Sequence, residues 1–100
     1  MEQCLLALIV SPSIENAVID WLLERDDIPG FNSSPINGHG TSTNTLTLQE
    51  QVAGHRRQVI FRMCLPEQVA RTVLDEVQQS FHGSGMHYWL MPVLTSGHIE

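Results

Sequence analysis

The strongest constraint on the fold of this chain is a short, nearly continuous apolar segment at residues 3–10 (QCLLALIV), which Ser11 and Pro12 end. A run of this length that is apolar on both alternating faces is typical of a buried central strand. It is far shorter than the roughly 20 residues that a membrane helix needs. We therefore expect a soluble protein that has this strand at its centre and does not insert into a membrane.

The position of the same segment near the start of the chain indicates the cellular compartment of the protein. It begins almost at Met1, with neither a basic leader nor a small-residue cleavage site. A secretory signal has both features. The pattern therefore favours a strand over a signal sequence, and we expect a cytoplasmic protein.

Two segments have the apolar spacing of amphipathic helices. The first, residues 12–25, follows a Ser11 cap and has Pro12 in its first turn. The second begins at Pro66, and Gly83 is expected to end it. The two apolar stripes consist of Ile14, Ala17, Val18, Trp21, Leu22 and Arg25, and of Val69, Ala70, Val73, Leu74, Val77 and Phe81. We expect both stripes to pack on a sheet.

Three further segments predict strands. Residues 57–65 alternate clearly. Residues 31–37 contain Pro35, which suits an edge strand or a bulge, and residues 87–94 contain Pro92, which indicates an edge strand or a kink. The order of elements predicts an α+β protein, a ferredoxin-like βαββαβ two-layer sandwich with a long loop between its second and third strands. A chain of 100 residues is long enough for one core, so we expect a single domain over residues 1–100.

The second face of such a sheet needs a cover, because both helices lie on the first. Leu5, Ala7 and Ile9, or else their alternating neighbours, must point away from the helices together with Ile60. Exposing this apolar surface to water is unfavourable. We therefore expect a homo-oligomer.

The segment from residue 38 to residue 54 is rich in Gly, Thr, Ser, Asn and Gln and has few side chains that could anchor a core. Residues 45–48 could extend a hairpin. Loops of this length inside compact domains are uncommon and are usually functional. This loop is therefore the first place to look for activity.

Charge and side-chain chemistry exclude several classes of function. The formal net charge is −6 and the chain has no lysine, which disfavours nucleic-acid binding. The basic pair Arg56 and Arg57 is either a solvated loop feature or a phosphate contact. No nucleophile, base and orienting group stand in a catalytic pattern, so we expect no enzyme. Cys4 and Cys64 are expected to be separate, free and buried thiols on opposite faces of the sheet.

The histidines are candidate metal ligands. His39 and His55 lie at the two ends of the long loop, and His82 and His87 flank a glycine turn, so that folding could bring each pair together. Imidazole is a common ligand of zinc, copper and nickel ions. The alternative is that each of these histidines is a surface or hydrogen-bonded residue.

Several short motifs occur in a characteristic order along almost the whole chain. They are the passage from residue 9 into Ser11-Pro12, Gly30-Phe31, Gly38-His39-Gly40, and Gly83-Ser84-Gly85, together with residues 50–57 (EQVAGHRR) and 88–93 (YWLMPV). In this order they resemble the PII-like signalling proteins. Within that group they resemble a small uncharacterised family whose members are often associated with heavy-metal efflux pumps.

This resemblance implies a homotrimer with ligand clefts between subunits and a loop that changes conformation on effector binding to control a target protein. It assigns effector binding to Gly38, His39, Gly40, Gly83, Ser84 and Gly85, and partner binding to Thr41, Leu46, Gln51, Arg56 and Arg57. The effector it implies is a divalent heavy-metal ion, bound by His39, His55, His82 and His87. The implied partner is a membrane efflux transporter. For the glycines, a purely structural role in turns is the alternative.

The chain departs from nucleotide-binding PII proteins at two places. Those proteins have a lysine just after the second glycine pair and arginines near the chain end, whereas Met86 and residues 95–100 stand here. Binding of a phosphate group would therefore depend on backbone N–H groups and on Arg56 or Arg57. The alternatives to metal sensing are a small-molecule or nucleotide-binding module and a structural oligomer subunit without an effector.

Overall fold

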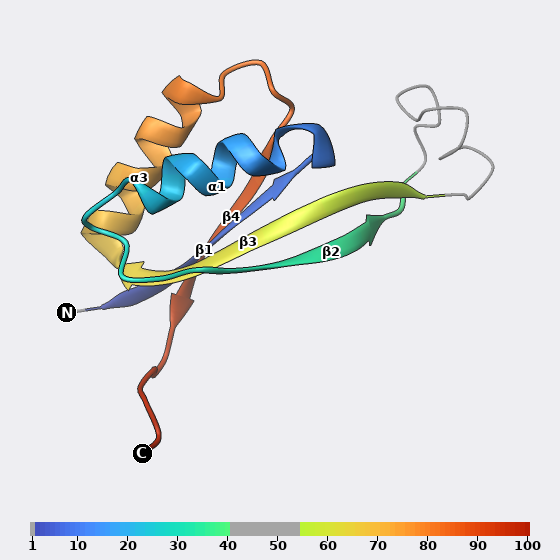
Figure 1. Ribbon diagram of the computed structural model, residues 1–100. Coiled ribbons are helices and arrows are strands. Elements are labelled where there is room, and N and C mark those ends of the chain that lie inside the picture. Colours follow the sequence, from blue (N-terminus) through green and yellow to red (C-terminus); the bar gives the residue numbers. More distant parts are fainter. Residues whose placement is uncertain (1, 41–54) are drawn as a thin grey trace.

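The described part of the chain folds into a four-stranded sheet with two helices packed on one of its faces (Figure 1). The computed structural model describes residues 2–40 and 55–100. The elements are β1 (Gln3–Val10), the 3₁₀ turn η1 (Pro12–Ile14), α1 (Glu15–Leu23), β2 (Asn32–Gly38), β3 (Arg56–Pro66), α3 (Glu67–Ser80) and β4 (His87–Val93). The strands are ordered β2-β3-β1-β4 and every neighbouring pair is antiparallel. The predicted α+β ferredoxin-like layout is confirmed. Within the described ranges, no helix is long and apolar enough to cross a membrane.

The register of the sheet separates its residues into two faces. Leu6 of β1 pairs with Met63 of β3 and Leu90 of β4, and these side chains face the helices. One residue further on, Ala7 pairs with Arg62 and Trp89 on the opposite face. We call this second side, which no helix of the described residues covers, the open face (Figure 1). Leu5, Ala7, Ile9 and Ile60 lie on it, as predicted.

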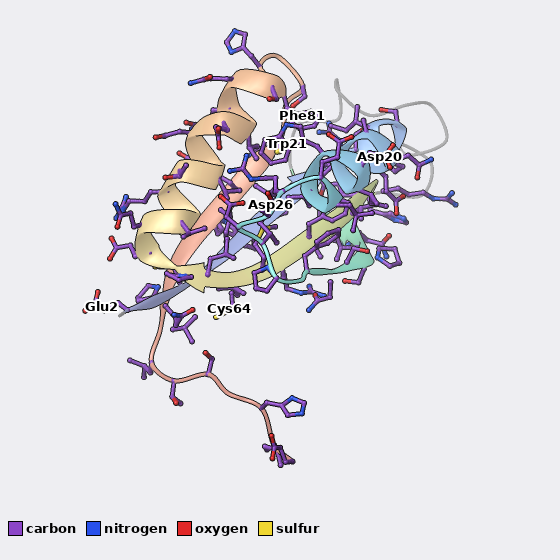
Figure 2. The ribbon with its side chains drawn as sticks, turned by 60° about the vertical axis from the view of Figure 1, so that its left-hand side comes forward. Glu2, Asp20, Trp21, Asp26, Cys64 and Phe81 are labelled. Atoms are coloured by element: carbon purple, nitrogen blue, oxygen red, sulfur yellow. The ribbon has the colours of Figure 1, made fainter. Side chains whose placement is uncertain are left out.

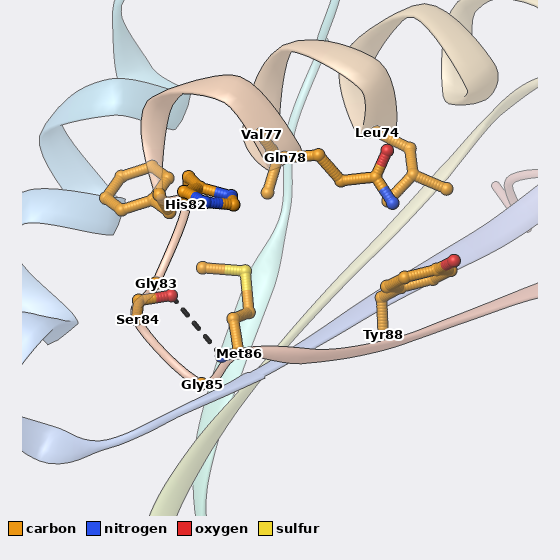
Figure 3. Close-up of a pocket in the computed structure, with 10 residues that line it drawn as sticks. Leu74, Val77, Gln78, His82, Gly83, Ser84, Gly85, Met86 and Tyr88 are labelled. Carbon is orange, nitrogen blue, oxygen red and sulfur yellow. Dashed lines mark hydrogen bonds between the residues drawn. The ribbon is translucent and has the colours of Figure 1, made fainter.

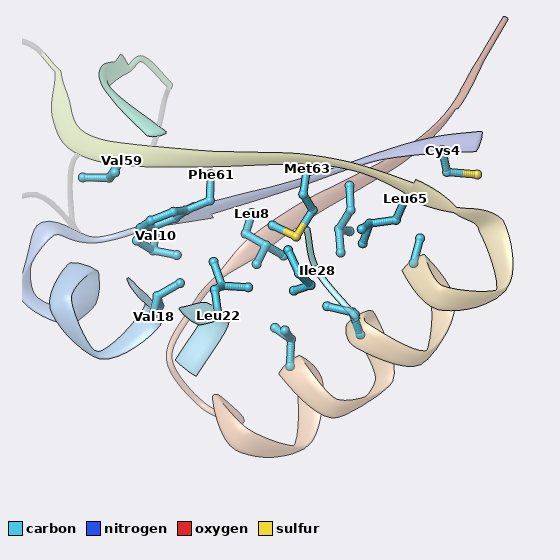
Figure 4. Close-up of a cluster of buried hydrophobic side chains, with 14 residues drawn as sticks. Cys4, Leu8, Val10, Val18, Leu22, Ile28, Val59, Phe61, Met63 and Leu65 are labelled. Carbon is cyan, nitrogen blue, oxygen red and sulfur yellow. The ribbon is translucent and has the colours of Figure 1, made fainter. Parts of the chain in front are cut away.

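The core lies between the sheet and the helices (Figure 4). Phe61, Leu6 and Leu8 are fully buried at its centre. Val18 and Leu22 of α1 meet them at i, i+4 spacing. From α3, the buried residues are Ala70, Val73 and Val77. Burial of these apolar side chains is the main stabilising contribution to the fold.

The helices begin and end differently from the prediction. Ser11 does act as a cap, because its Oγ accepts a hydrogen bond from the Ser13 N–H, but it caps a 3₁₀ turn and not the α-helix itself. Ala17 is exposed and lies outside the buried stripe, because the nine-residue α1 buries only the narrow face of residues 18 and 22. The second helix ends at Ser80, and Gly83 belongs to the following turn.

The two cysteines lie on opposite faces, as expected from their strand positions. Cys4 is buried in the core, while Cys64 is only half-buried on the open face, so the prediction of two buried thiols was wrong for Cys64. The Cys64 thiol donates a long hydrogen bond of 3.9 Å to the Gln3 Oε1. Neither α1 nor α3 covers that face, which is consistent with this partial exposure.

A polar and aromatic cluster joins the two helices. Trp21 packs edge-on against Phe81, with ring centroids 6.0 Å apart, and its Nε1 donates a hydrogen bond of 3.1 Å to the Ser80 Oγ (Figure 2). The Arg25 guanidinium lies 4.8 Å from the centre of the Trp21 ring. It also forms ion pairs with Asp27 at 2.8 Å and with Glu76 of α3 at 2.6 Å. The cluster therefore fixes the end of α1 against α3.

The ion pairs of Arg25 predict a specific acid sensitivity. The hydrogen bond from Arg25 lowers the pKa of the Asp27 carboxyl below its ordinary value. A lowered folded-state pKa adds stability above the unfolded-state pKa, at about pH 4, and that stability is lost as the pH falls through the lowered value. Arg25→Met should cost about 1 kcal/mol at neutral pH and flatten the fall of unfolding free energy below about pH 4. Urea titrations at a series of pH values measure both effects.

The matched control is Arg71→Met. Arg71 pairs with Glu67 one helical turn away, but its side chain is 65% exposed. Solvent screens such a pair, so its loss should not change how the unfolding free energy falls below about pH 4. If the unfolding free energy falls equally steeply below about pH 4 in Arg25→Met and in the unmodified protein, the role assigned to Arg25 is contradicted.

Candidate functional site

A tight turn between α3 and β4 contains the three residues of the second glycine motif. Gly83 and Gly85 have φ values of 82° and 77°, in the left-handed region that favours glycine. The Ser84 N–H donates to the Phe81 carbonyl at 3.1 Å, and the Ser84 Oγ accepts a hydrogen bond of 3.3 Å from the Met86 N–H. The glycines therefore allow the chain to reverse sharply, and Ser84 holds the resulting turn.

The turn closes one end of a cavity of about 330 Å³ between α3 and β4 (Figure 3). Its apolar wall consists of Leu74 and Val77 of α3 and Phe81 directly after that helix, together with Met86 and Tyr88 from the other side. Gln78, His82 and Ser84 supply the polar side chains, and the described residues that line the cavity include no arginine. A mostly apolar cavity with a few hydrogen-bonding groups suits a small organic molecule and lacks the charge that a polyphosphate requires.

The structure gathers part of the predicted effector site in this cavity. Gly83, Ser84, Gly85 and His82 all line it. His87 is not among the lining residues: it is the first residue of β4 and pairs with Ile9, on the open face. The His82 and His87 side chains therefore belong to different faces of the sheet.

A second group of predicted residues meets at the ends of β2 and β3. Gly38 pairs with Arg56 as the last step of the ladder. A Cβ at Gly38 would meet the end of the flexible Gln58 side chain, which can move aside, so space alone does not require a glycine there. His39 comes directly after β2 and His55 directly before β3. Their ring centroids are 5.7 Å apart, with an interplanar angle of 51°. The predicted approach of these two histidines is present.

This separation suits a shared metal ion. A zinc ion bonds a histidine nitrogen at about 2.0–2.1 Å, so one ion fits between two rings at the observed distance. His39 is exposed and His55 half-buried, so both are within reach of a dissolved ion. In residues 2–40 and 55–100, no group of three or more His, Cys, Asp and Glu side chains is arranged to hold a metal. The described residues therefore bring together two potential ligands, His39 and His55, and form no complete metal site.

The remaining predicted residues lie near the same pair or outside the described chain. Arg56 and Arg57 begin β3, paired with Gly38 and Asn37. Gly40 is exposed beside His39, with open space around it. Thr41, Leu46 and Gln51, and the suggested hairpin extension at residues 45–48, lie outside the described residues.

Sequence reasoning did not assign Gln78, Phe81, Met86 or Tyr88 to a common site, although all four line the cavity. A signal was available for Tyr88, because alternation along β4 places it on the helix side with Leu90. For Phe81 the helical stripe correctly predicted packing on the core. It did not reveal that the same ring also borders a cavity.

Comparison with solved structures places this architecture among known proteins. A DUF3240 family protein from Shewanella baltica OS155 superposes with a TM-score of 0.79 at 22% identity, covering 98% of this chain and 97% of that chain. CPII from Thiomonas intermedia K12, a nitrogen regulatory PII-like protein bound to ADP, AMP and bicarbonate, superposes with a TM-score of 0.70 at 16% identity, covering 99% and 98%. A Bacillus cereus protein related to NIF3 gives 0.68 at 16% identity, covering 97% of this chain and 26% of that chain. These likenesses show a shared fold.

Comparisons at the level of sequence give the family. A search of the curated proteins found no match. The sequence model of the family described as "Protein of unknown function (DUF3240)" matches residues 1–100. Since the match spans the whole chain, this protein belongs to the DUF3240 family, within a PII-like fold.

Proposed function

We propose that this chain is a PII-like regulatory protein, and not an enzyme, that binds a small organic effector in the cavity beside Gly83 and Gly85. The observation that carries the proposal is the cavity itself, which the predicted glycine motif closes and apolar side chains line. The shared fold with CPII supports a regulatory class. Met86 and the other lining residues favour a compact molecule with few charges over a polyphosphate.

A second candidate effector is a divalent heavy-metal ion. The specific observation in its favour is the 5.7 Å separation of the His39 and His55 rings at the ends of β2 and β3. Binding there would bias the conformation of the segment between these strands, because an ion shifts a conformational equilibrium by its differential affinity. In this version the segment contacts a cytoplasmic part of a membrane efflux transporter.

Both versions include self-association, and a homotrimer is the form we propose. Trp89 and Met91 on the open face are 54% and 41% exposed in the single chain. Large exposed apolar side chains on an uncovered sheet face favour an interface. Native mass spectrometry and light scattering after size exclusion measure the number of copies, and a monomer at micromolar concentration would contradict this part of the proposal.

Calorimetry and ligand-observed NMR separate the two effectors. The purified protein is titrated with a library of small aromatic and heterocyclic fragments, with AMP, ADP and ATP, and with zinc, copper and nickel ions. Leu74→Trp should fill the cavity and abolish fragment binding, because Leu74 lines its apolar wall. Leu23→Trp is the matched control, since Leu23 is 68% exposed on α1. Fragment binding that survives in Leu74→Trp would overturn the cavity proposal.

The metal version has its own variant. His39→Ala should weaken metal binding at least about tenfold, because even groups that only orient a ligand contribute that much to affinity. His98→Ala, in the exposed residues after β4, is the control and should have no effect. Equal metal affinity in His39→Ala and the unmodified protein would exclude the His39 and His55 pair as the site.

A further inference from the structure

The open face has one row of side chains in which apolar and charged groups stand close together. Ala7 pairs with Arg62 on one side and with Trp89 on the other, so the small Ala7 side chain lies between two large ones. In the next row, Leu5 pairs with Cys64 and with Met91. Half of the Trp89 surface is exposed. This face therefore offers a ready apolar contact in the single chain.

The same chain carries a second unpartnered apolar surface, in residues 94–100, which we call the tail. Leu94 is 101% exposed and Ile99 is 97% exposed. Figures 1 and 2 show the tail leaving the end of β4 and running away from the two-layer body. Its first residues, 94–96, border an open cavity of about 860 Å³ whose other side includes Glu67 and Arg71, so they are not packed on their own helix.

Return of the tail to its own open face would require a reversal of the chain. Residues 95–100 contain no turn. An extended segment of seven residues reaches about 23 Å, which is enough to cross a neighbouring sheet. The geometry therefore favours contact with a second molecule.

The charges on the two surfaces are complementary. Arg62 is a cation on the open face, and its hydrogen-bond partners among the described residues are the neutral Asn32 Oδ1 at 2.9 Å and Ser34 Oγ at 3.1 Å. The tail carries Glu100. In a chain of net charge −6, copies repel one another on average, and a local Arg62 to Glu100 contact would offset part of that repulsion.

We propose that residues 94–100 of one copy lie across the open face of a second copy, with Leu94 and Ile99 beside Trp89 and Met91 and with Glu100 toward Arg62. This inference deepens the self-association proposed above and rests on it. It explains together the exposure of Trp89 and Met91 on the open face and of Leu94 and Ile99 in the tail. It also makes the tail, and not only the sheet, a determinant of assembly.

The first test removes the apolar side chains of the tail. The double variant Leu94→Ser with Ile99→Ser should raise the dissociation constant of the oligomer about tenfold or more for each side chain removed. Dilution series followed by light scattering measure this constant. Leu23→Ser is the matched control, because Leu23 is exposed but lies on α1. An unchanged constant in the double variant would overturn the proposal.

A second test exchanges the charges. Arg62→Glu should weaken association, and Glu100→Arg in the same chain should restore it, because the pair is then reversed. Rescue would support the contact, whereas additive weakening would overturn it. The emission of Trp89, measured in a Trp21→Phe background, should shift to the red as the oligomer dissociates.

A third test asks which copy the tail contacts. Isotopically labelled and unlabelled chains carrying Ile99→Cys are mixed and treated with a short bismaleimide reagent, with the half-buried Cys64 of the open face as the partner thiol. Links between residues 99 and 64 of differently labelled chains support the proposal, and links within one chain alone overturn it. Fragment titration of the same variants separates the failures: intact fragment binding with unaffected assembly removes the tail inference and leaves the effector proposal standing.

Discussion

Phe61→Ala is expected to lower the free energy of unfolding by about 3–5 kcal/mol, the range measured for deletion of buried aromatic rings. Phe61 is fully buried on β3, and its ring lies 6.1 Å from that of Phe31. Its loss opens a cavity between the sheet and α1 that Leu8 and Val18 cannot refill without leaving their own contacts. Since the total free energy of unfolding of a native protein is about 5–15 kcal/mol, the variant should be close to unfolding.

Urea titration followed by circular dichroism measures this loss. Phe31→Ala is the comparison, because Phe31 is the other member of the ring pair but only half-buried against the core. We expect it to cost clearly less than Phe61→Ala, since less apolar area is exposed to water on truncation. Equal costs for the two variants would show that the centre of the core is elsewhere.

The order of elements could be predicted because it depends on local patterns. The apolar run of residues 3–10 indicates a central strand, and in the structure β1 lies between β3 and β4. The alternation of residues 57–65 correctly separated the core-facing Phe61 from the outward-facing Arg62. Pro35 and Pro92 correctly indicated edge strands, since β2 and β4 end the sheet.

The errors concern features that depend on contacts distant in sequence. Ala17 fits a helical stripe, but which part of that stripe is buried depends on how α1 crosses the sheet. Cys64 fits the pattern of a buried thiol, but its burial depends on whether a layer covers the open face. Propensity and periodicity carry no information on either crossing angle or layer coverage.

The candidate site was predictable only where backbone geometry dictates residue type. Gly83 and Gly85 are readable because a reversal with positive φ favours glycine. The approach of His39 and His55 could be predicted because the antiparallel pairing of β2 and β3 brings the adjoining strand ends together. The cavity wall from Leu74 to Phe81 could not be predicted, because the same apolar pattern is expected whether a helix packs fully on the core or lines a cavity.

The double variant Gly83→Val with Gly85→Val is expected to destabilise the protein by about 2–4 kcal/mol and to abolish effector binding. The Cβ atom that each substitution adds meets open space, so a clash of that atom with neighbouring residues is not the source of the cost. Instead the cost comes from the left-handed backbone, which disfavours L-residues by roughly 1–2 kcal/mol each and β-branched residues most of all. Chemical denaturation measures the first effect and fragment titration the second.

The control Gly30→Val separates backbone strain from the simple addition of a branched side chain. Gly30 also has open space around it, but its φ is not positive. It should therefore change stability by less than about 0.5 kcal/mol, as most surface substitutions do. If Gly83→Val with Gly85→Val loses stability but still binds the fragments, the turn is only a structural element and the cavity does not need its shape. If the variant relaxes into another turn, Met86 loses its hydrogen bond to the Ser84 Oγ, the wall containing Met86 and Tyr88 shifts, and binding disappears even under conditions in which the chain stays folded.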